Sequence, residues 1–179
     1  MIWAIIIVIG IILDQVSKHL ITHFMDLYQS IPVIDGFFDI HYVTNTGGAW
    51  SMLSGHTWLL TLISVLMVAG LIFYMTRTRH ACMRLGISLI VGGAIGNMID
   101  RVFAGAVVDF LDFIIFGYDF PVFNLADILV VCGTGLLIVY VIGFYDAVQA
   151  KLDQATEAVK AAEDVEVIQT ESLQEEPEN

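Results

Sequence analysis

The sequence predicts an all-α membrane protein with four transmembrane helices and a small extracytoplasmic β element. The chain has 179 residues, of which 58% are hydrophobic and 15% are charged, and its mean hydropathy is +0.81. Soluble domains are less apolar and carry about 25% charged residues. Four apolar stretches mark candidate spanning helices, and the loop between the first two has the composition of strands. These observations exclude an ordinary soluble enzyme as the default class.

The first predicted span covers about residues 2–21. The apolar run at its start, Met1–Leu13, would reach only about 20 Å as a helix, whereas the hydrocarbon core of a bilayer is about 30 Å thick. To cross the membrane, this helix has to continue through Asp14 and Lys18. Ionisable side chains inside a span are costly, so these two residues need a structural or functional reason.

A β-rich loop covers about residues 30–55, between the first and second spans. Phe37–Thr44 is aromatic and β-branched, which is typical of a strand. The turn-forming segment Asn45–Gly48 follows, and residues 49–53 are predicted to return as a second strand. We expect a small sheet that lies on the outer face of the membrane.

Three further spans and a tail complete the predicted architecture. The spans cover about residues 57–75, 85–101 and 124–145, so that residues 1–145 form one transmembrane domain. Residues 146–179 hold ten acidic residues and two lysines, which is −8 of the net charge of −12. This composition predicts a separate acidic tail that is partly disordered, and it leaves no basic patch for nucleic acid.

The distribution of Lys and Arg predicts the orientation in the membrane. Arg77, Arg79 and Arg84 lie in or beside the short loop between the second and third spans, whereas residues 23–56 carry no Lys or Arg and three Asp. Cytoplasmic loops are enriched in Lys and Arg. With four spans, both termini and the acidic tail are then cytoplasmic, and the other two loops face outward.

Polar and ionisable residues gather at the outward ends of the spans and in the outward loops. They are Asp14, Lys18, Asn45, Asn97, Asp100, Arg101, Asp109, Asn124 and Asp127. The predicted topology puts all of them on one side of the membrane and near one depth. Since such residues are expensive inside a span, this convergence is the strongest functional signal in the sequence.

Two of these residues, Asp109 and Asp127, are carboxylates in apolar surroundings. Asp109 lies among Val and Phe, and Asp127 begins an apolar helix. Burying either as an ion would cost several kcal/mol unless it were paired or protonated. Two acids held close together share one proton, so that one serves as a base that activates water and the other as an acid that protonates a carbonyl oxygen. This is the chemistry of aspartic proteases.

Simpler interpretations stand beside this one. Asp14 and Lys18, four residues apart on one helix face, are as well explained by an interfacial ion pair. Arg101 has the position of a side chain that reaches the lipid head groups, but we expect it to be engaged by Asp100 or by neighbouring loop carbonyls. The spacing of Gly92 and Gly96 is typical of close helix packing.

A metal centre is not expected. His19 and His23 are four residues apart, but the sequence offers them no HExxH motif and no obvious third ligand. The two cysteines, Cys82 and Cys132, have no metal-binding spacing. We therefore predict neither a metal nor a cofactor.

Five segments of the sequence resemble the motifs of the lipoprotein signal peptidase family, signal peptidase II, in the family's order. The segments are Asp14–Lys18, Asn45–Ser51, Gly92–Arg101, Val107–Phe110 and Phe123–Asp127. Together they cover the membrane region, and the acidic tail lies outside the resemblance. One departure is Gly48-Ala49-Trp50, where the family commonly has Ala-Ala-Phe.

The resemblance implies a function for residues 1–145 as a catalytic domain. Members of this family are aspartic endopeptidases of the bacterial inner membrane that cleave a prolipoprotein before its diacylglyceryl-modified cysteine. The resemblance implies Asp109 and Asp127 as the catalytic pair. It implies that the other polar residues line or support the site: Asn45, Asn97, Arg101, Asn124, Asp14, Lys18 and Asp100. Its partners would be lipidated prolipoproteins and membrane lipids, and we expect a monomer with its site on the periplasmic face.

A proton- or ion-coupled transporter is the alternative function for the same carboxylates. Transporters commonly place such groups near the bilayer midplane and contain inverted repeats. Here the carboxylates are predicted at one interface, and the sequence has no evident repeat. These two features favour the protease.

Overall fold

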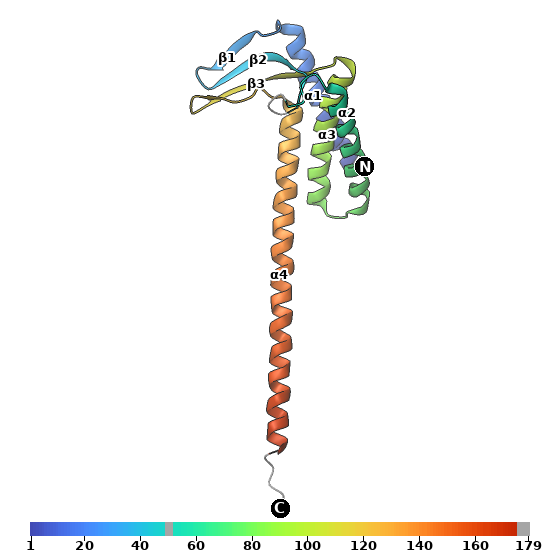
Figure 1. The fold of residues 1–179 in the computed structure, drawn as a ribbon, viewed down its shortest axis with the longest axis vertical. Coiled ribbons are helices and arrows are strands. Elements are labelled where there is room, and N and C mark those ends of the chain that lie inside the picture. Colours follow the sequence, from blue (N-terminus) through green and yellow to red (C-terminus); the bar gives the residue numbers. More distant parts are fainter. Residues whose placement is uncertain (49–51, 175–179) are drawn as a thin grey trace, which may run out of the picture. The chain divides into compact units, whose positions relative to one another are not determined.

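The computed structural model describes residues 1–48 and 52–174, and Figure 1 shows how their helices and strands are arranged. In chain order the elements are α1 (Ile2–Phe24), β1 (Ser30–Ile34), β2 (Phe38–Asn45), α2 (Thr57–Arg77), α3 (Ala81–Phe103), β3 (Val107–Ile115), β4 (Tyr118–Asp119) and α4 (Leu125–Gln174). Four segments are long and apolar enough to cross a membrane: Ile2–Phe24, Thr57–Arg77, Ala81–Phe103 and Leu125–Leu152. The predicted fold class is therefore confirmed, and α1 does continue through Asp14 and Lys18.

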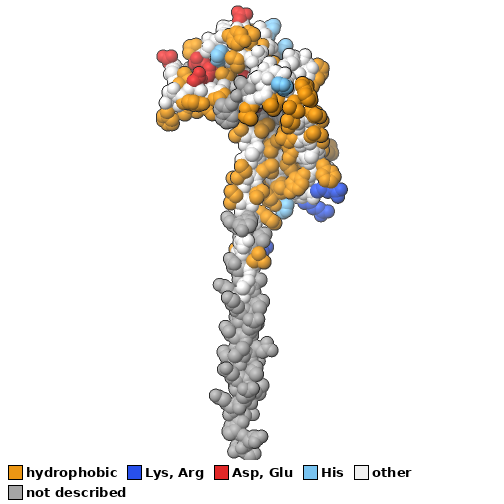
Figure 2. All heavy atoms as spheres, in the orientation of Figure 1, with side chains coloured by type: hydrophobic (Ala, Val, Ile, Leu, Met, Phe, Trp, Pro, Cys, Tyr) orange, Lys and Arg blue, Asp and Glu red, His pale blue; other side chains and the backbone are white. Residues whose placement is uncertain are grey.

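Helix α3 is the centre of the helical part. In α3, 61% of the apolar stretch that could span a membrane is buried inside the protein, whereas the buried share of the same stretch is 17% in α1 and 6% in α2. Its residues Ile87, Val91 and Ala94 form the core together with Val68 of α2. The other helices turn large apolar side chains outward, as expected for surfaces that lipid covers. Figure 2 shows these hydrophobic side chains along the helices.

Two glycines of α3 allow the close approaches on which the site depends. A Cβ atom added to Gly93 would collide with the carbonyl oxygen of Ala126 in α4. At Gly96 it would collide with the carboxylate of Asp14 in α1. The glycine-rich stretch of α3 therefore brings the start of α4 and an acidic residue of α1 against one helix.

The strands form one antiparallel sheet in the order β1-β2-β3-β4, at one end of the helices (Figure 1). The strand predicted around residues 37–44 is present as β2. Its neighbours are β1 and β3, with Ile31 opposite Ile40 and Asn45 opposite Val107. The predicted return strand falls partly on residues 49–51, which lie outside the described residues, and residues 52–55 form turns. The departure at Gly48-Ala49-Trp50 also falls largely outside the described part of the chain.

Helix α4 belongs to two compact units, Met1–Leu137 and Ile138–Asn179. The first unit contains the sheet, α1, α2, α3 and the start of α4. The second is helical as far as Gln174. A domain boundary at residue 145 and partial disorder of the tail remain predictions.

Candidate active site

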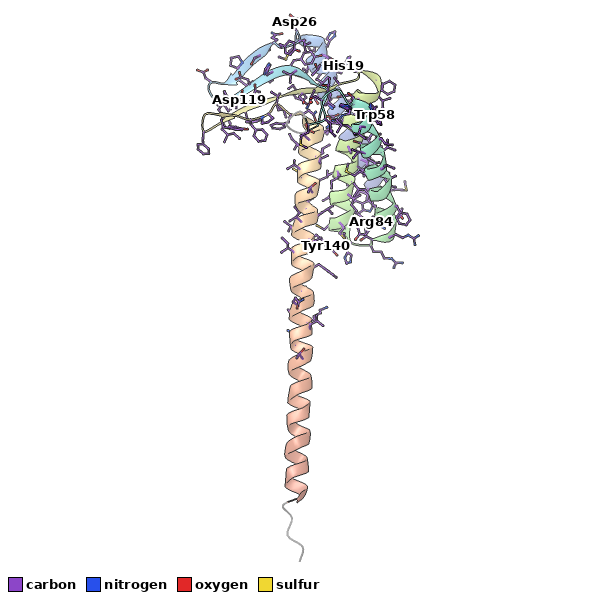
Figure 3. The ribbon with its side chains drawn as sticks, viewed as in Figure 1. His19, Asp26, Trp58, Arg84, Asp119 and Tyr140 are labelled. Carbon is purple, nitrogen blue, oxygen red and sulfur yellow. The ribbon has the colours of Figure 1, made fainter. Side chains whose placement is uncertain are left out.

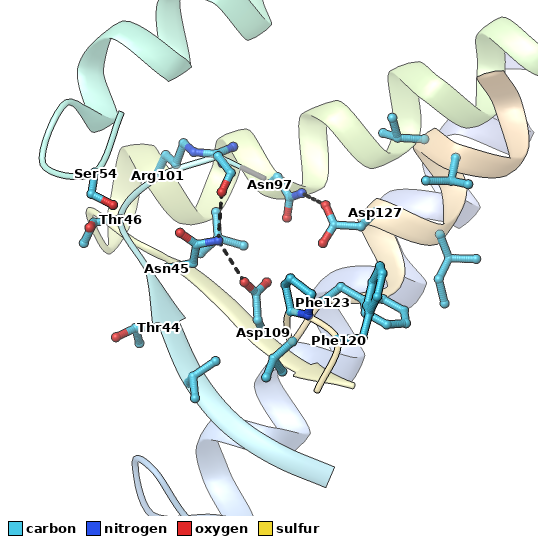
Figure 4. A pocket seen from close by; sticks show the side chains of 18 of the residues that line it. Thr44, Asn45, Thr46, Ser54, Asn97, Arg101, Asp109, Phe120, Phe123 and Asp127 are labelled. Carbon is cyan, nitrogen blue, oxygen red and sulfur yellow. Dashed lines mark hydrogen bonds between the residues drawn. The ribbon is translucent and has the colours of Figure 1, made fainter. Parts of the chain in front are cut away.

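The predicted polar residues meet at a pocket where the sheet joins the helices. The pocket has a volume of about 860 Å³, and Figure 4 shows it from close by. Its polar lining includes Asn45 from β2, Asn97 and Arg101 from α3, Asp109 from β3 and Asp127 from α4. Four elements, β2, α3, β3 and α4, thus contribute side chains to one cavity.

Asp127 is fixed by the way α4 begins. The side-chain oxygen of Asn124 accepts the backbone N–H of Asp127 at 3.1 Å, and Oδ2 of Asp127 accepts the backbone N–H of Asn124 at 3.1 Å. This reciprocal pair is a capping box, which the sequence specifies by an acidic residue three positions after an Asn. Asn97 Nδ2 of α3 donates to Oδ1 of Asp127 at 2.8 Å. Both carboxylate oxygens therefore have a fixed donor.

Asp109 lies opposite Asp127 and is only 3% exposed. Asn124 Nδ2 donates to its Oδ1 at 2.6 Å, and Asn45 Nδ2 donates to its Oδ2 at 3.1 Å. Burial, and next the nearby charge of Asp127, raise the pKa of Asp109 from 3.8 to about 7, against the opposing effect of these hydrogen bonds. Since Asn124 contacts both carboxylates, one side chain sets their relative position.

Behind the pocket lies a cluster of buried charges, Asp14, Lys18 and Asp100. Lys18 Nζ is 2.9 Å from Asp14 Oδ2 and 2.9 Å from Asp100 Oδ2, and the Lys18 and Asp14 side chains are 4% and 0% exposed. The ammonium group also donates to Asn97 Oδ1 at 2.8 Å. The Asp14–Lys18 pair is thus buried inside the protein rather than interfacial.

The buried cluster also supports the start of α4. Asp14 Oδ1 accepts the backbone N–H of Ala126 at 3.0 Å, although Asp14 is in α1. The first backbone N–H groups of a helix have no partner within it, so a carboxylate there is stabilising. Through Ala126 and Asn97, the buried cluster therefore holds two of the neighbours of Asp127.

Arg101 is held in the wall of the pocket by a loop. Its Nη2 donates to the carbonyl oxygen of Gly47 at 3.1 Å, which confirms the expected engagement by a loop carbonyl. Its Nε is buried and has no hydrogen-bond partner among the described residues. The guanidinium group thus keeps a donor beside the pocket that lies close to both Asp109 and Asp127.

Two parts of this arrangement were not anticipated from the sequence. Strand β3, which carries Asp109, is not among the elements that the sequence predicts, although Leu111-Asp112-Phe113 alternates as a strand does. Gln15 was not singled out either, yet its Nε2 donates to Asp100 Oδ1 at 2.9 Å and to the carbonyl oxygen of Gly96 at 3.1 Å. Its place directly beside Asp14 was the available signal.

The described residues contain no group of three or more His, Cys, Asp or Glu side chains arranged to hold a metal ion. The carboxylates of the pocket have only amide groups within hydrogen-bonding distance there. What the arrangement can do on its own is move protons between two carboxyl groups and a substrate bound between them.

Comparisons with known proteins agree on one family. Residues 6–143 match the family model described as signal peptidase (SPase) II. The chain is 43% identical over 137 residues to a lipoprotein signal peptidase of Symbiobacterium thermophilum, covering 75% of this chain and 90% of that protein. It is 46% identical over 136 residues to one of Geobacillus thermodenitrificans, covering 75% and 85%. A solved structure described as a bacterial membrane enzyme has a TM-score of 0.75 and 38% identity, covering 79% of this chain and 87% of that one.

Proposed function

Because the chain belongs to the signal peptidase II family of membrane peptidases, we propose that it is an aspartic endopeptidase whose catalytic pair is Asp109 and Asp127. The observation that carries this proposal is that both carboxylates line one pocket. Asn124 donates to Asp109 there and forms a capping box with Asp127. Membership of this peptidase family favours the protease over the transporter alternative.

The different surroundings of the two carboxyl groups support different roles. A pKa of about 7 leaves Asp109 protonated in a large share of molecules near neutral pH, which suits an acid. Asp127, whose two oxygens accept N–H groups from Asn97 and Asn124, is the base in this scheme. Asp127 takes a proton from water, whose oxygen bonds to the carbonyl carbon of the substrate. Asp109 gives its proton to the carbonyl oxygen. As the tetrahedral intermediate collapses, Asp127 gives the proton it took from water to the leaving amine, the C–N bond breaks, and a hydroxyl of the intermediate returns a proton to Asp109.

Asn45, Asn97 and Asn124 serve as positioning residues in this scheme, and Arg101 as a substrate-facing donor. The amides fix the carboxyl oxygens without adding charge, because amide N–H groups are neutral donors. The free Nε of Arg101 is placed to bind an oxygen of the bound peptide. The buried cluster of Asp14, Lys18 and Asp100 supports these residues from behind the pocket.

The substrate we propose is a prolipoprotein, cut before a cysteine that carries diacylglycerol. The relatives are lipoprotein signal peptidases by name. Beside its carboxylates the pocket is lined by apolar side chains, among them Phe120, Phe123, Ile128 and Val131. Val131 is 69% exposed on α4, so this wall continues onto a surface that lipid covers. A lipid-bearing peptide could thus reach the carboxylates from the bilayer. We also propose that the protein acts as a monomer.

For the location we propose the bacterial inner membrane, with both termini cytoplasmic and the pocket on the periplasmic face. Arg77 ends α2, Arg79 lies in the loop that follows, and Arg84 is in the first turn of α3, which Figure 3 places at the end of the helices remote from the sheet. A His80→Cys variant that also carries Cys82→Ser and Cys132→Ser should be labelled by thiol reagents in cells only after the inner membrane is opened. Labelling of intact spheroplasts at that position would reverse the topology.

The direct test is cleavage by the purified protein in detergent micelles. A synthetic prolipopeptide with a diacylglyceryl cysteine should be cut on the amino side of that cysteine, as identified by mass spectrometry. The matched peptide with an unmodified cysteine should be cut far more slowly or not at all. Absence of cleavage of the lipidated peptide by folded protein would contradict the proposed activity, and equal cleavage of both peptides would contradict the proposed substrate.

A further inference from the structure

The sheet has one polar face and one apolar face. Side chains along a strand alternate between faces, and residues directly opposite on neighbouring antiparallel strands share a face. Ile40 is opposite Ile31 and Leu111, which puts these three on one face. The carboxylate of Asp39, opposite Asp112, lies on the other. Figure 2 shows carboxylates on the side of the sheet that points away from the helices, and hydrophobic side chains along its lower edge.

The apolar face is covered near the pocket but not at the far end of the sheet. Close to the pocket, Phe38 and Phe113 stack at 4.5 Å between ring centroids, and Phe113 stacks on Phe123 at 5.7 Å. Farther out, the face ends in Ile115 and Tyr118, which are opposite each other and 42% and 60% exposed. The aromatic stack therefore continues outward into an apolar surface that no described residue covers.

The hairpin between β3 and β4 ends in an unusual residue. Phe116 and Gly117 form its two-residue loop, and both have positive φ, 51° and 79°. Two-residue hairpin loops of this kind favour Asn, Asp or Gly at the first position, because a bulky side chain there is strained. Phe116 is also fully exposed, at 105%. The protein thus holds a large aromatic ring in a strained position where no described residue covers it.

The neighbouring hairpin, between β1 and β2, also exposes apolar side chains at its tip. Ile34 and Phe37, at the turn between β1 and β2, are 52% and 45% exposed. The carbonyl oxygen of Phe37 accepts the backbone N–H of Ile114, so the two hairpin tips lie side by side. We call Ile34, Phe37, Ile115, Phe116 and Tyr118 the tip surface.

We propose that the tip surface binds the lipid of the outer leaflet, with Phe116 inserted among the glycerol and upper acyl groups. The occupant follows from the surroundings, because the sheet joins the same end of helices whose outward surfaces are apolar enough to span a bilayer. Aromatic side chains are favoured at this depth, and apolar area with Phe and Tyr is what holds an element in the interface. Lipid contact also offsets the strain of Phe116. This interaction surface is independent of the peptidase reaction.

The test measures where the tip surface lies in vesicles of phosphatidylcholine and phosphatidylglycerol. The full chain carries Cys82→Ser and Cys132→Ser, and an NBD fluorophore on Tyr118→Cys reports the tip. The matched control carries the fluorophore on Asp26→Cys, an exposed residue just after the end of α1 that Figure 3 places at the top of the view, on the side of the sheet that points away from the helices. Phosphatidylcholine with a spin label at carbon 5 is the lipid quencher, and iodide is the aqueous quencher.

We expect the lipid quencher to act strongly at position 118 and not at position 26, and iodide to act in the reverse order. Adding Phe116→Asn, which suits a positive-φ turn, should abolish most of the lipid quenching at position 118 while the near-UV circular dichroism is unchanged. Iodide quenching at position 118 equal to that at position 26 would overturn the lipid contact. Lipid quenching that survives Phe116→Asn would overturn the role of Phe116.

Discussion

Aspartate side chains have different surroundings in two neighbouring regions of the protein. One region is the pocket pair, Asp109 and Asp127, and the other is the buried cluster of Asp14, Lys18 and Asp100. In the buried cluster, one ammonium group lies 2.9 Å from both carboxylates. In the pocket pair, the described residues offer neutral amide donors and no cation within ion-pair distance. Asn97 joins the two sets, since it accepts from Lys18 at 2.8 Å and donates to Asp127 at 2.8 Å.

The difference separates a structural carboxylate from one that is free to exchange protons. The carboxylates of the buried cluster are engaged in ion pairs with Lys18 and do not line the pocket, so a substrate cannot reach them. A carboxylate on an open pocket, beside a second one, can carry the shared proton that hydrolysis needs. We therefore expect changes in the pocket pair to alter cleavage and changes in the buried cluster to alter stability.

The largest effect on cleavage is expected in the pocket pair. Asp109→Asn and Asp127→Asn nearly preserve shape but each remove a proton-transfer group, so each should lower the cleavage rate by more than about a hundredfold. Both variants should elute from gel filtration at the wild-type volume and unfold cooperatively, which shows that they are folded. Cleavage within tenfold of wild type by either variant, measured on the lipidated peptide, would break the distinction between the two sets.

The largest effect on stability is expected in the buried cluster. Lys18→Met removes the cation and leaves two buried carboxylates without a counter-charge, so it should lower the free energy of unfolding by about 3–5 kcal/mol. Asp14→Asn, which still offers an oxygen to Ala126, is the milder companion. Denaturant unfolding in micelles measures both. An unchanged unfolding midpoint for Lys18→Met would show that the cluster is not structural.

The pocket pair should weaken the fold at high pH. The pKa of Asp109 is about 7 in the folded protein and 3.8 without burial, so the folded state keeps a proton that the unfolded state loses. Stability from this group is present below about pH 4 and is lost as the pH rises through about 7. Asp109→Asn should thus be more stable than wild type at pH 8 and not at pH 4. Equal midpoints at pH 8 would refute the raised pKa.

The smallest effect is expected from the acidic tail. Deleting residues 153–179 should leave the cleavage rate of the membrane-inserted protein unchanged, because the pocket is lined by residues of the first compact unit. The assay is the same lipidated peptide at equal amounts of folded protein. A large fall in turnover would mean that the tail takes part in catalysis.

The sequence was informative wherever a local pattern has one physical meaning. Apolar length predicted the four spans, and the Asn124-to-Asp127 spacing is that of a capping box. Local patterns could not place β3 beside β2, because strand pairing depends on contacts distant in the sequence. Nor could they show that Lys18 pairs with Asp100 as well as with Asp14, since a helix face reveals only its own neighbours.

The site was predictable as a set of residues rather than as an arrangement. The predicted position of the polar residues on one side of the membrane identified those that line the pocket. How deeply each is buried depends on glycines that allow close helix contacts, such as Gly96 against Asp14. That contact puts Asp14 inside the protein and leaves Asp109 and Asp127 on the pocket. Which carboxylates are paired and which are open is a property of packing, and the sequence alone did not decide it.

The pH dependence of cleavage tests most directly whether the pocket pair performs the reaction. The wild-type rate on the lipidated peptide should fall as the pH rises above about 7, where Asp109 loses its proton. Asp14→Asn, corrected for folded fraction, should keep the same alkaline limb. A flat profile from acid to alkaline pH in folded, substrate-binding protein, or a limb that moves with Asp14→Asn, would contradict catalysis by Asp109 and Asp127.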